Sequence, residues 1–198
     1  SEDPFVSGKI AAAIVKGLQS VTGISACPKH FACNNQEFKR NRNDSRVSER
    51  ALREIYIKGF EICVKEAKPI NIMTSYNKIN GIHASDSQEL LTDILRTEWG
   101  FDGLVVTDWG ALNDRIEGYK AGCDLNMPGG SKFMEKAALD AVHSGELDEA
   151  YIDATVERIL RLVEKSQGIP APQIDWDTHH ALALKVAEQG AVLLKNED

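Results

Sequence analysis

The chain has 198 residues, of which 42% are hydrophobic and 27% are charged, and its formal net charge at pH 7 is −7. A chain of this size can bury a hydrophobic core without a disulfide or metal to hold it together. Positive and negative residues are interspersed without a basic stripe, so we expect no nucleic-acid partner.

No stretch approaches the roughly 18 apolar residues of a membrane span, and none has the pattern of a signal peptide, so we expect no membrane partner. The chain opens with SEDPF rather than an initiator Met. We therefore expect the natural start to lie upstream, and the compartment stays open between cytoplasm and secretion. The sequence contains no glycine-rich phosphate loop, and we expect no organic cofactor. The cysteines have no C-x-x-C or metal-ligand spacing, which predicts core or near-core thiols and no metal site. They are Cys27, Cys33, Cys63 and Cys123.

The first quarter of the chain predicts a helix, an apolar segment and a loop. Asp3 followed by Pro4 is typical of a helix N-terminus, and apolar residues at helical spacing follow. The segment GISACPKHF, residues 23–31, is short and apolar with a polar and aromatic end. Residues 32–47 are polar and predict a long loop.

A strong amphipathic helix is expected from Ser48, and a strand with a polar end is expected over residues 70–77, INIMTSYN. Asp86 and Glu89 resemble a capping box, which predicts a helix that ends near Gly100. The apolar face of the first of these helices comprises Leu52, Ile55, Tyr56, Phe60 and Cys63.

The second half of the chain continues the alternation. GLVVTDWG, residues 103–110, predicts a strand, and a helix is expected directly after it. CDLNMPGG, residues 123–130, predicts a fourth strand followed by two helices. GIPAPQIDW is a proline-rich connector, and the tail from residue 179 predicts a helix that runs into a strand.

Strands that alternate with helices predict βα units, a parallel sheet and an α/β fold. About four such units can be distinguished, roughly half of the eight in a (β/α)₈ barrel. The expected fold is therefore half of a TIM barrel, followed by the first elements of something else.

Three of the predicted strands end in polar or aromatic residues. In a parallel barrel the carboxyl ends of the strands meet on one face, where catalytic residues lie. Singly, each residue has a simpler explanation, because an aspartate after a strand often caps a loop and aromatic residues often pack in the core. Their recurrence at equivalent positions favours a shared site. The strand ends are Lys29-His30-Phe31, Ser75-Tyr76-Asn77 and Asp108-Trp109.

These residue types suit the chemistry of a sugar. An ionised Asp108 on a rigid strand end can attack a carbon that develops positive charge and form a covalent intermediate. Lys29, His30 and Tyr76 offer N–H and O–H donors for sugar hydroxyls, and Trp109 offers an apolar plate for the C–H face of a pyranose. Together they suggest glycoside hydrolysis.

Seven stretches are distinctive in combination: SEDP, KHFACNNQE, SERALREIY, MTSYNKINGI, LLTDILRTEWGFDGLVVTDWGA, AGCDLNMPG and EQGAVLLKNED. In this order they cover almost the whole chain, and they resemble glycoside hydrolase family 3 in its β-glucosidase branch. The resemblance implies a (β/α)₈ catalytic domain followed by an α/β sandwich domain. It also implies that Asp108 is the catalytic nucleophile. The residues that it implies for the sugar subsite are Lys29, His30, Tyr76, Met73 and Trp109.

One departure bears on the branch of the family and on the general acid/base. The family's N-acetylglucosaminidases resemble K-H-F-P-G-H-G, whereas Ala32 follows Phe31 here, so that branch is disfavoured. In the β-glucosidase branch the acid/base is usually a glutamate of the second domain, and we expect it outside this chain. The carboxylates Glu37, Glu98 and Glu117 are better explained as structural or solvated groups.

The sequence thus predicts part of a retaining exo-β-glycosidase that removes terminal non-reducing β-D-glucosyl residues. A β-xylosidase or arabinofuranosidase of the same family, and a non-catalytic fragment that binds sugar weakly, are the alternatives. The expected domains are a partial barrel over 1–168, a linker over 169–178 and the start of a sandwich domain over 179–198. An incomplete barrel leaves strand edges open, so we expect self-association or pairing with the missing parts.

Overall fold

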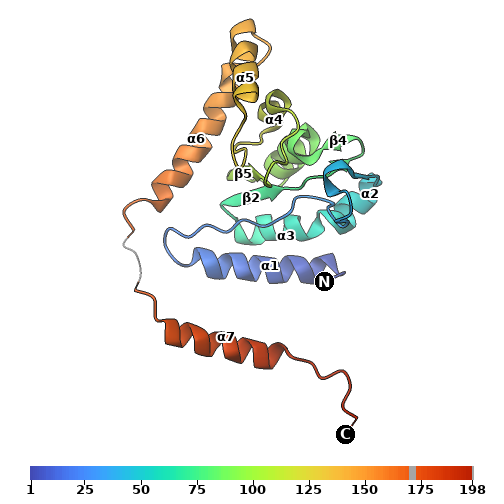
Figure 1. Cartoon of the computed structure of the whole chain (residues 1–198), viewed down its shortest axis with the longest axis vertical. Helices are drawn as coiled ribbons and strands as arrows, with labels where there is room; N and C mark the ends of the chain where they lie inside the picture. The colour runs from blue at the N-terminus through green and yellow to red at the C-terminus, as the bar shows by residue number, and fades with distance from the viewer. Residues whose placement is uncertain (170–172, 198) are drawn as a thin grey trace. The chain divides into compact units, whose positions relative to one another are not determined.

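The computed structural model describes residues 1–169 and 173–197, which fall into two compact units, Ser1–Gln167 and Gly168–Asp198. Figure 1 shows that the first unit contains a small sheet flanked by helices. Within the described residues, no helix combines the length and the apolar character that crossing a membrane requires.

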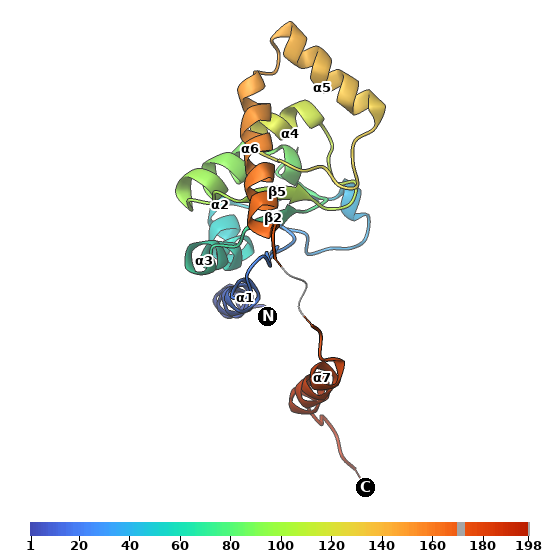
Figure 2. The same cartoon turned by 90° about the vertical axis from the view of Figure 1, so that its left-hand side faces the viewer.

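Two parallel strands form the centre of the first unit. Strand β2 (Asn71–Thr74) pairs with β5 (Leu104–Thr107) along its whole length, and the two lie side by side in Figures 1 and 2. All four residues of β5 are buried, which explains its run of leucine and β-branched side chains. The strands predicted over 70–77 and 103–110 are confirmed, although each is shorter than its predicted segment.

An extended segment flanks each side of this pair. Phe31 forms a parallel bridge to Thr74, and Leu125 forms a parallel bridge to Val106. Four chain segments therefore run in parallel, in the order expected for consecutive βα units. The fourth strand predicted over 123–130 is reduced to its one bridge, because the following MPGG includes a proline that has no N–H to extend the ladder.

Helices follow each extended segment, and five of the ten in the first unit begin at an Asp or Ser whose side chain accepts a backbone N–H bond. Asp3 caps the first helix in this way, as predicted. The helices of the first unit are α1 (Pro4–Gln19), η1 (Arg40–Arg42), α2 (Glu49–Ala51), η2 (Leu52–Tyr56), α3 (Lys58–Ala67), η3 (Ala84–Asp86), η4 (Glu89–Glu98), α4 (Arg115–Ala121), α5 (Lys132–Ser144) and α6 (Glu149–Ser166).

The helix predicted from Ser48 contains a π-helical turn, which changes the face that it buries. In η2 the N–H of Ile57 donates to the carbonyl of Leu52 over 2.9 Å, a spacing of five residues rather than four. The extra residue rotates the next turn, so that Leu52 and Ile57 are buried while Ile55 is 52% exposed and Tyr56 is 39% exposed. The predicted apolar face is therefore wrong at Ile55 and Tyr56.

The capping box predicted for η4 is also wrong. The Oγ atom of Ser87, rather than the carboxylate of Asp86, accepts from the backbone N–H of Leu90 over 3.2 Å. The Asp86 carboxylate instead accepts from the hydroxyl of Ser85 and the amide of Asn113, each over 3.0 Å. The adjacent Ser85, and Asn113 from the loop after β5, thus bind the carboxylate in place of the helix N-terminus.

A second sheet, made of three two-residue strands, fixes the long polar loop. Strand β1 (Asp44–Ser45) pairs in parallel with β3 (Lys78–Ile79), which pairs antiparallel with β4 (Ile82–His83). The side chain of Asn80 donates to and accepts from the backbone of Val47 over 2.9 Å. The segment predicted as a loop over 32–47 therefore includes a short strand, and it is attached just beyond the end of β2.

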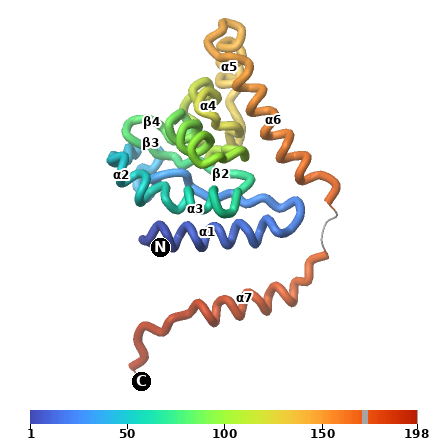
Figure 3. The backbone as a smooth tube through the Cα atoms, turned by 180° about the vertical axis from the view of Figure 1, so that it is seen from behind, coloured from blue at the N-terminus to red at the C-terminus, as the bar shows by residue number. Residues whose placement is uncertain are grey.

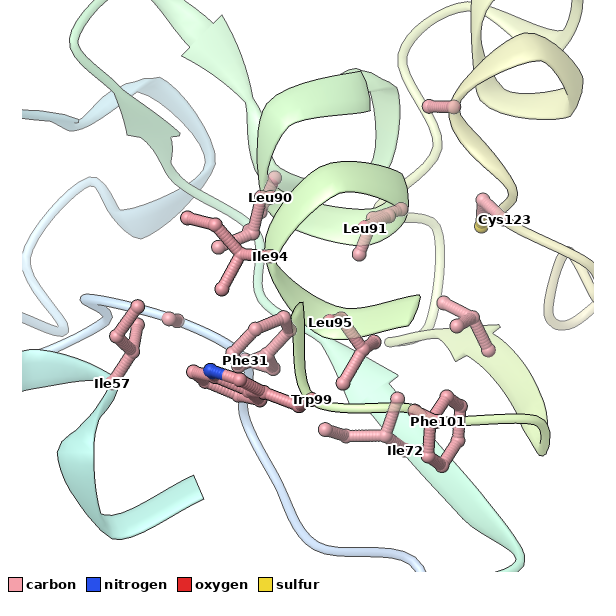
Figure 4. Packing of buried hydrophobic residues seen from close by; sticks show 14 of the residues in the cluster. Phe31, Ile57, Ile72, Leu90, Leu91, Ile94, Leu95, Trp99, Phe101 and Cys123 are labelled. Carbon is pink, nitrogen blue, oxygen red and sulfur yellow. The ribbon is translucent and has the colours of Figure 1, made fainter. Parts of the chain in front are cut away.

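The main core lies between η4 and the sheet. Figure 4 shows leucine and isoleucine side chains of η4 above Ile72 of β2, with Phe31 and Trp99 next to each other. The ring centroids of Phe31 and Trp99 are 5.8 Å apart, and Phe31 is fully buried. This packing anchors the end of the segment that carries His30.

Helices α1 and α3 lie side by side, as Figures 1 and 3 show, and they approach closely because each contributes a glycine. A Cβ atom on Gly8 would lie 2.9 Å from Cβ of Ile62 and 3.1 Å from Cα of Gly59. On the same helix α1, a Cβ atom on Gly17 would have no neighbour within 4 Å.

The substitution Gly8→Ala is expected to lower the free energy of unfolding by about 1–3 kcal/mol, because the added methyl group has to push the two helices apart. Gly17→Ala is the matched control and is expected to raise it by about 0.5–1 kcal/mol, since alanine restricts the unfolded chain and fits a helix. Urea unfolding of both variants measures the difference. Equal effects would contradict the close helix contact.

The second unit contains helix α7 (Trp176–Gly190), which begins with Asp175 accepting from the N–H of Thr178. The helix predicted in the tail is confirmed, but residues 191–197 form no strand. The strand predicted at the end of the tail is therefore wrong, because the second unit contains no other strand among its described residues with which this segment could pair. The linker predicted over 169–178 includes residues 170–172, which lie outside the described residues.

Candidate active site

Asp108 lies directly after β5, where the chain turns sharply away from the sheet. Its carbonyl accepts from the N–H of Ala111 over 3.0 Å, and Gly110 adopts φ +76°, a value that favours glycine. The backbone N–H of Trp109 donates to Oδ1 of Asp108 over 2.6 Å. A buried strand and a tight turn thus fix the carboxylate, whose side chain is 16% exposed.

His30 contacts the other oxygen of this carboxylate. Its Nε2 atom lies 3.0 Å from Oδ2 of Asp108. Burial lowers the pKa of His30 below its ordinary value of 6.5, although the nearby Asp108 carboxylate acts in the opposite direction. At neutral pH the ring is therefore mainly uncharged, and its Nε2 atom lies within contact distance of the carboxylate.

Tyr76 approaches the same turn from the end of β2. Its hydroxyl donates to the carbonyl of Trp109 over 2.9 Å, and the residue is buried. Burial raises the pKa of Tyr76, and the negative charge of Asp108 raises it further. The phenol is therefore protonated at neutral pH and is a hydrogen-bond donor beside Asp108.

The remaining predicted site residues lie around this group without a recorded contact to the carboxylate. Lys29 is exposed and, within residues 1–169 and 173–197, forms no ion pair. With His30 and Tyr56 it lines a hollow of about 450 Å³ that Asp108 does not line. Met73 is half-buried in β2, and the indole of Trp109 is largely exposed.

The three alternative carboxylates each form an exposed ion pair, which agrees with their interpretation as structural or solvated groups. Glu37 pairs with Arg40 over 2.9 Å, and Glu117 pairs with Lys120 over 2.9 Å. Glu98 accepts two bonds from the guanidinium of Arg53.

Arg40 is a neighbour of the site that the sequence did not single out. Its guanidinium carbon lies 4.4 Å from the ring centroid of Tyr76, a cation–π geometry. The residue belongs to the segment predicted as a loop, and its distance from Tyr76 in the sequence gives no signal of this contact.

In chemical terms the site presents one fixed carboxylate with an imidazole and a phenol as donors beside it. The arrangement suits attack on an electron-poor carbon within a polyhydroxylated ligand, because the donors can bind hydroxyl groups while a carboxylate oxygen attacks the carbon. His30, Tyr76, Asp108 and Trp109 come from three separate segments of the chain and meet at one edge of the sheet.

Comparisons with known proteins match this architecture. Over all of its length the chain is 48% identical to thermostable β-glucosidase B of Acetivibrio thermocellus and 45% identical to an exo-α-(1→6)-L-arabinopyranosidase of Bifidobacterium longum, and it covers 26% of each. It superimposes on β-glucosidase 3B of Thermotoga neapolitana in complex with glucose with a TM-score of 0.90 and 42% identity, covering all of this chain and 29% of that one. The chain thus spans about a quarter of the length of the curated relatives it matches.

The α/β fold predicted from the sequence is confirmed by these structures, and the fold matches a fragment of the N-terminal TIM-barrel domain of the family. Residues 1–162 match the family described as the glycosyl hydrolase family 3 N-terminal domain. Since this match extends over most of the sequence, the family resemblance is confirmed, and the chain belongs to glycosyl hydrolase family 3.

Proposed function

We propose that this chain is the nucleophile-bearing part of a retaining exo-β-glycosidase that hydrolyses terminal non-reducing β-D-glucosyl residues. The observation that carries the proposal is the contact of His30 Nε2 with Asp108 Oδ2 at 3.0 Å, at the end of a buried strand and beside Tyr76. The names of the relatives, which include β-glucosidases of several organisms, support the substrate class.

In the proposed first step an oxygen of Asp108 bonds to the anomeric carbon while the bond from that carbon to the leaving oxygen breaks. A general acid protonates the leaving oxygen. Water then attacks the same carbon, gives its proton to that group acting as base, and releases the Asp108 carboxylate with the anomeric configuration retained. We propose that the acid lies outside this chain, in the second domain.

Each binding residue has a proposed role in this scheme. His30 orients Asp108 and, with Lys29 and Tyr76, donates hydrogen bonds to sugar hydroxyls. The half-buried side chain of Met73 and the exposed indole of Trp109 supply apolar surface for the subsite.

A second candidate substrate is a pentoside, as in a β-xylosidase or arabinofuranosidase. A relative named as an arabinopyranosidase at 45% identity gives this alternative specific support. Relative kcat/KM values of the whole protein for an aryl β-glucoside, β-xyloside and α-L-arabinopyranoside distinguish them, and we expect the glucoside to be preferred.

Covalent labelling tests the proposed role of Asp108. An activated 2-deoxy-2-fluoro-β-glucoside with a dinitrophenolate leaving group needs little acid assistance, so we expect it to form a stable ester on Asp108 of the whole protein. Mass spectrometry of peptides locates the ester. The variant Asp108→Asn should not be labelled, whereas Asp102→Asn, an exposed aspartate just before β5, should be labelled like the wild type.

Label at another residue, or equal labelling of Asp108→Asn, would contradict the proposal. The chain by itself is expected to show no steady turnover of an aryl β-glucoside. Steady turnover by these 198 residues would contradict the placement of the acid outside them, and it would exclude the alternative of a non-catalytic fragment.

We also propose the domain extents 1–168, 169–178 and 179–198, and association of the isolated chain with a second copy or with further barrel segments. An apolar stripe on α1 supports association, because Ile10, Ile14 and Leu18 are each about half exposed. Static light scattering of the chain should give a mass above that of one copy. A clean monomer would contradict this proposal.

A further inference from the structure

The polar segment of residues 32–47 brings Arg40 to the site, as a second cation in addition to Lys29. The guanidinium carbon of Arg40, in η1, lies 4.4 Å from the centroid of the Tyr76 ring, and its Nη1 atom donates to Oε2 of Glu37 over 2.9 Å. The Tyr76 hydroxyl in turn donates to the carbonyl of Trp109, whose N–H binds Asp108. One line of contacts therefore runs from Arg40 to the carboxylate.

The backbone around Arg40 is fixed to the same strand end that carries Tyr76. The carbonyl of Asn43 accepts from the N–H of Lys78 over 2.8 Å, two residues beyond Tyr76. The hydroxyl of Ser45 donates to the carbonyl of Cys33 over 2.9 Å, which closes the segment on itself. Arg40 is thus held over Tyr76 by backbone pairing as well as by its own side chain.

We propose that Arg40 is a positioning residue of the site: its guanidinium plane holds the Tyr76 ring in place and sets a fixed positive charge beside the His30–Asp108 pair. Its importance for sugar turnover depends on the proposed function, whereas the positioning itself does not. A guanidinium suits this task because its plane stacks on an aromatic face, which an ammonium group does less well.

The charges that face His30 make the proposal testable, because each of them moves the pKa of His30 in a known direction. Four charged groups act on the imidazole: Asp108 after β5, Lys29 next to His30 in the chain, and Arg40 and Glu37 of the polar segment. The neutral phenol of Tyr76 binds the turn that carries Asp108. Burial is the largest cause that lowers the pKa of His30. Arg40 and Lys29 lower that pKa further, whereas Asp108 and Glu37 raise it.

NMR titration of the His30 ring in the 198-residue chain gives the first readout. Arg40→Met is expected to raise the pKa of His30, and Glu37→Gln is expected to lower it. Arg40→Lys keeps the charge and should leave the pKa near the wild-type value. Arg42→Met removes an exposed arginine of the same segment and is the matched control, with no change expected. An unchanged His30 pKa in Arg40→Met would overturn the proposal.

Steady-state kinetics of the whole protein gives the second readout. Arg40→Met and Arg40→Lys are expected to lower kcat for an aryl β-glucoside by about five- to tenfold, with a smaller change in KM, because a loosened Tyr76 no longer orients Asp108 for attack. Arg42→Met should keep wild-type kcat. Wild-type kcat in Arg40→Lys would overturn the stacking role, and this variant decides the question if Arg40→Met does not fold.

The two readouts separate the failure of the inference from the failure of the proposed function. If the wild-type protein cleaves no glycoside, yet the His30 pKa moves in opposite directions in Arg40→Met and Glu37→Gln, the function is wrong and Arg40 still positions the site. If the wild-type protein turns over and both Arg40 variants match it in kcat and in pH profile, the function stands and the inference is wrong.

Discussion

Replacing Asp108 by asparagine is expected to lower kcat/KM of the whole protein for an aryl β-glucoside by at least about 1,000-fold. The amide cannot form the glycosyl ester, while its size preserves the turn after β5. The expected loss is large because the carboxylate takes part in bond formation itself, unlike a residue that only orients the substrate. Initial rates with a dinitrophenyl glucoside measure the loss, since its leaving group makes attack by Asp108 the step most directly tested.

The matched control is Asp102→Asn, which neutralises an exposed carboxylate on the same chain segment and should leave kcat/KM unchanged. A variant with a smaller side chain at position 108 gives a product whose anomeric configuration identifies the nucleophile. In Asp108→Gly, sodium azide can enter the space of the missing carboxylate and form a C–N bond to the anomeric carbon as dinitrophenolate leaves. The product should be the α-glucosyl azide. Full activity of Asp108→Asn, or a β-azide product, would contradict the assigned nucleophile.

The pattern of apolar residues, together with the polar residues at the strand ends, was sufficient to predict the elements that position Asp108. The run LVVT is apolar at every position, and such a run in an α/β chain predicts a strand buried on both faces, which β5 is. Parallel pairing then requires that the ends of neighbouring strands lie together, and His30 and Tyr76 do lie beside Asp108. This part of the site follows from local pattern and one rule of topology.

Tertiary contacts decided the features that the sequence did not predict. The π-helical turn at Leu52 leaves Ile55 exposed, although its spacing is that of an α-helix. Asp86 has the spacing of a helix cap, yet Asn113 from a later loop binds it. Arg40 reaches Tyr76 only because β1 pairs with β3. Each case depends on a partner more than 20 residues away or on a local change of helix type, and neither is encoded in a short pattern.

Asp124 is the clearest example of a residue whose structural role the sequence pattern did not predict. Its carboxylate is fully buried and accepts from Nη2 of Arg96 over 2.8 Å, from Nη1 of Arg158 over 2.7 Å and from the N–H of Val105 over 2.8 Å. It therefore joins η4, α6 and the strand that carries Asp108. Burial lowers the pKa of Arg96, and the Asp124 carboxylate opposes that effect by stabilising the charged form.

The substitution Asp124→Asn is expected to lower the free energy of unfolding by about 3–5 kcal/mol, because it leaves two partly buried guanidinium groups without their fully buried counter-charge. This is a large share of the 5–15 kcal/mol typical of a whole domain. Urea unfolding followed by the fluorescence of buried Trp99 measures it. Asp140→Asn is the matched control, since Asp140 pairs with Lys136 on the exposed side of α5, and it should change stability by less than about 1 kcal/mol.

A double-mutant cycle tests the cause of this loss. If uncompensated charge is responsible, Arg158→Met combined with Asp124→Asn should cost less than the sum of the two single substitutions, because removing one arginine relieves part of the repulsion. Strict additivity would assign the loss to the backbone bond of Val105 instead. An Asp124→Asn protein within about 1 kcal/mol of the wild type would show that the buried ion pairs do not hold η4 and α6 to the strand of Asp108.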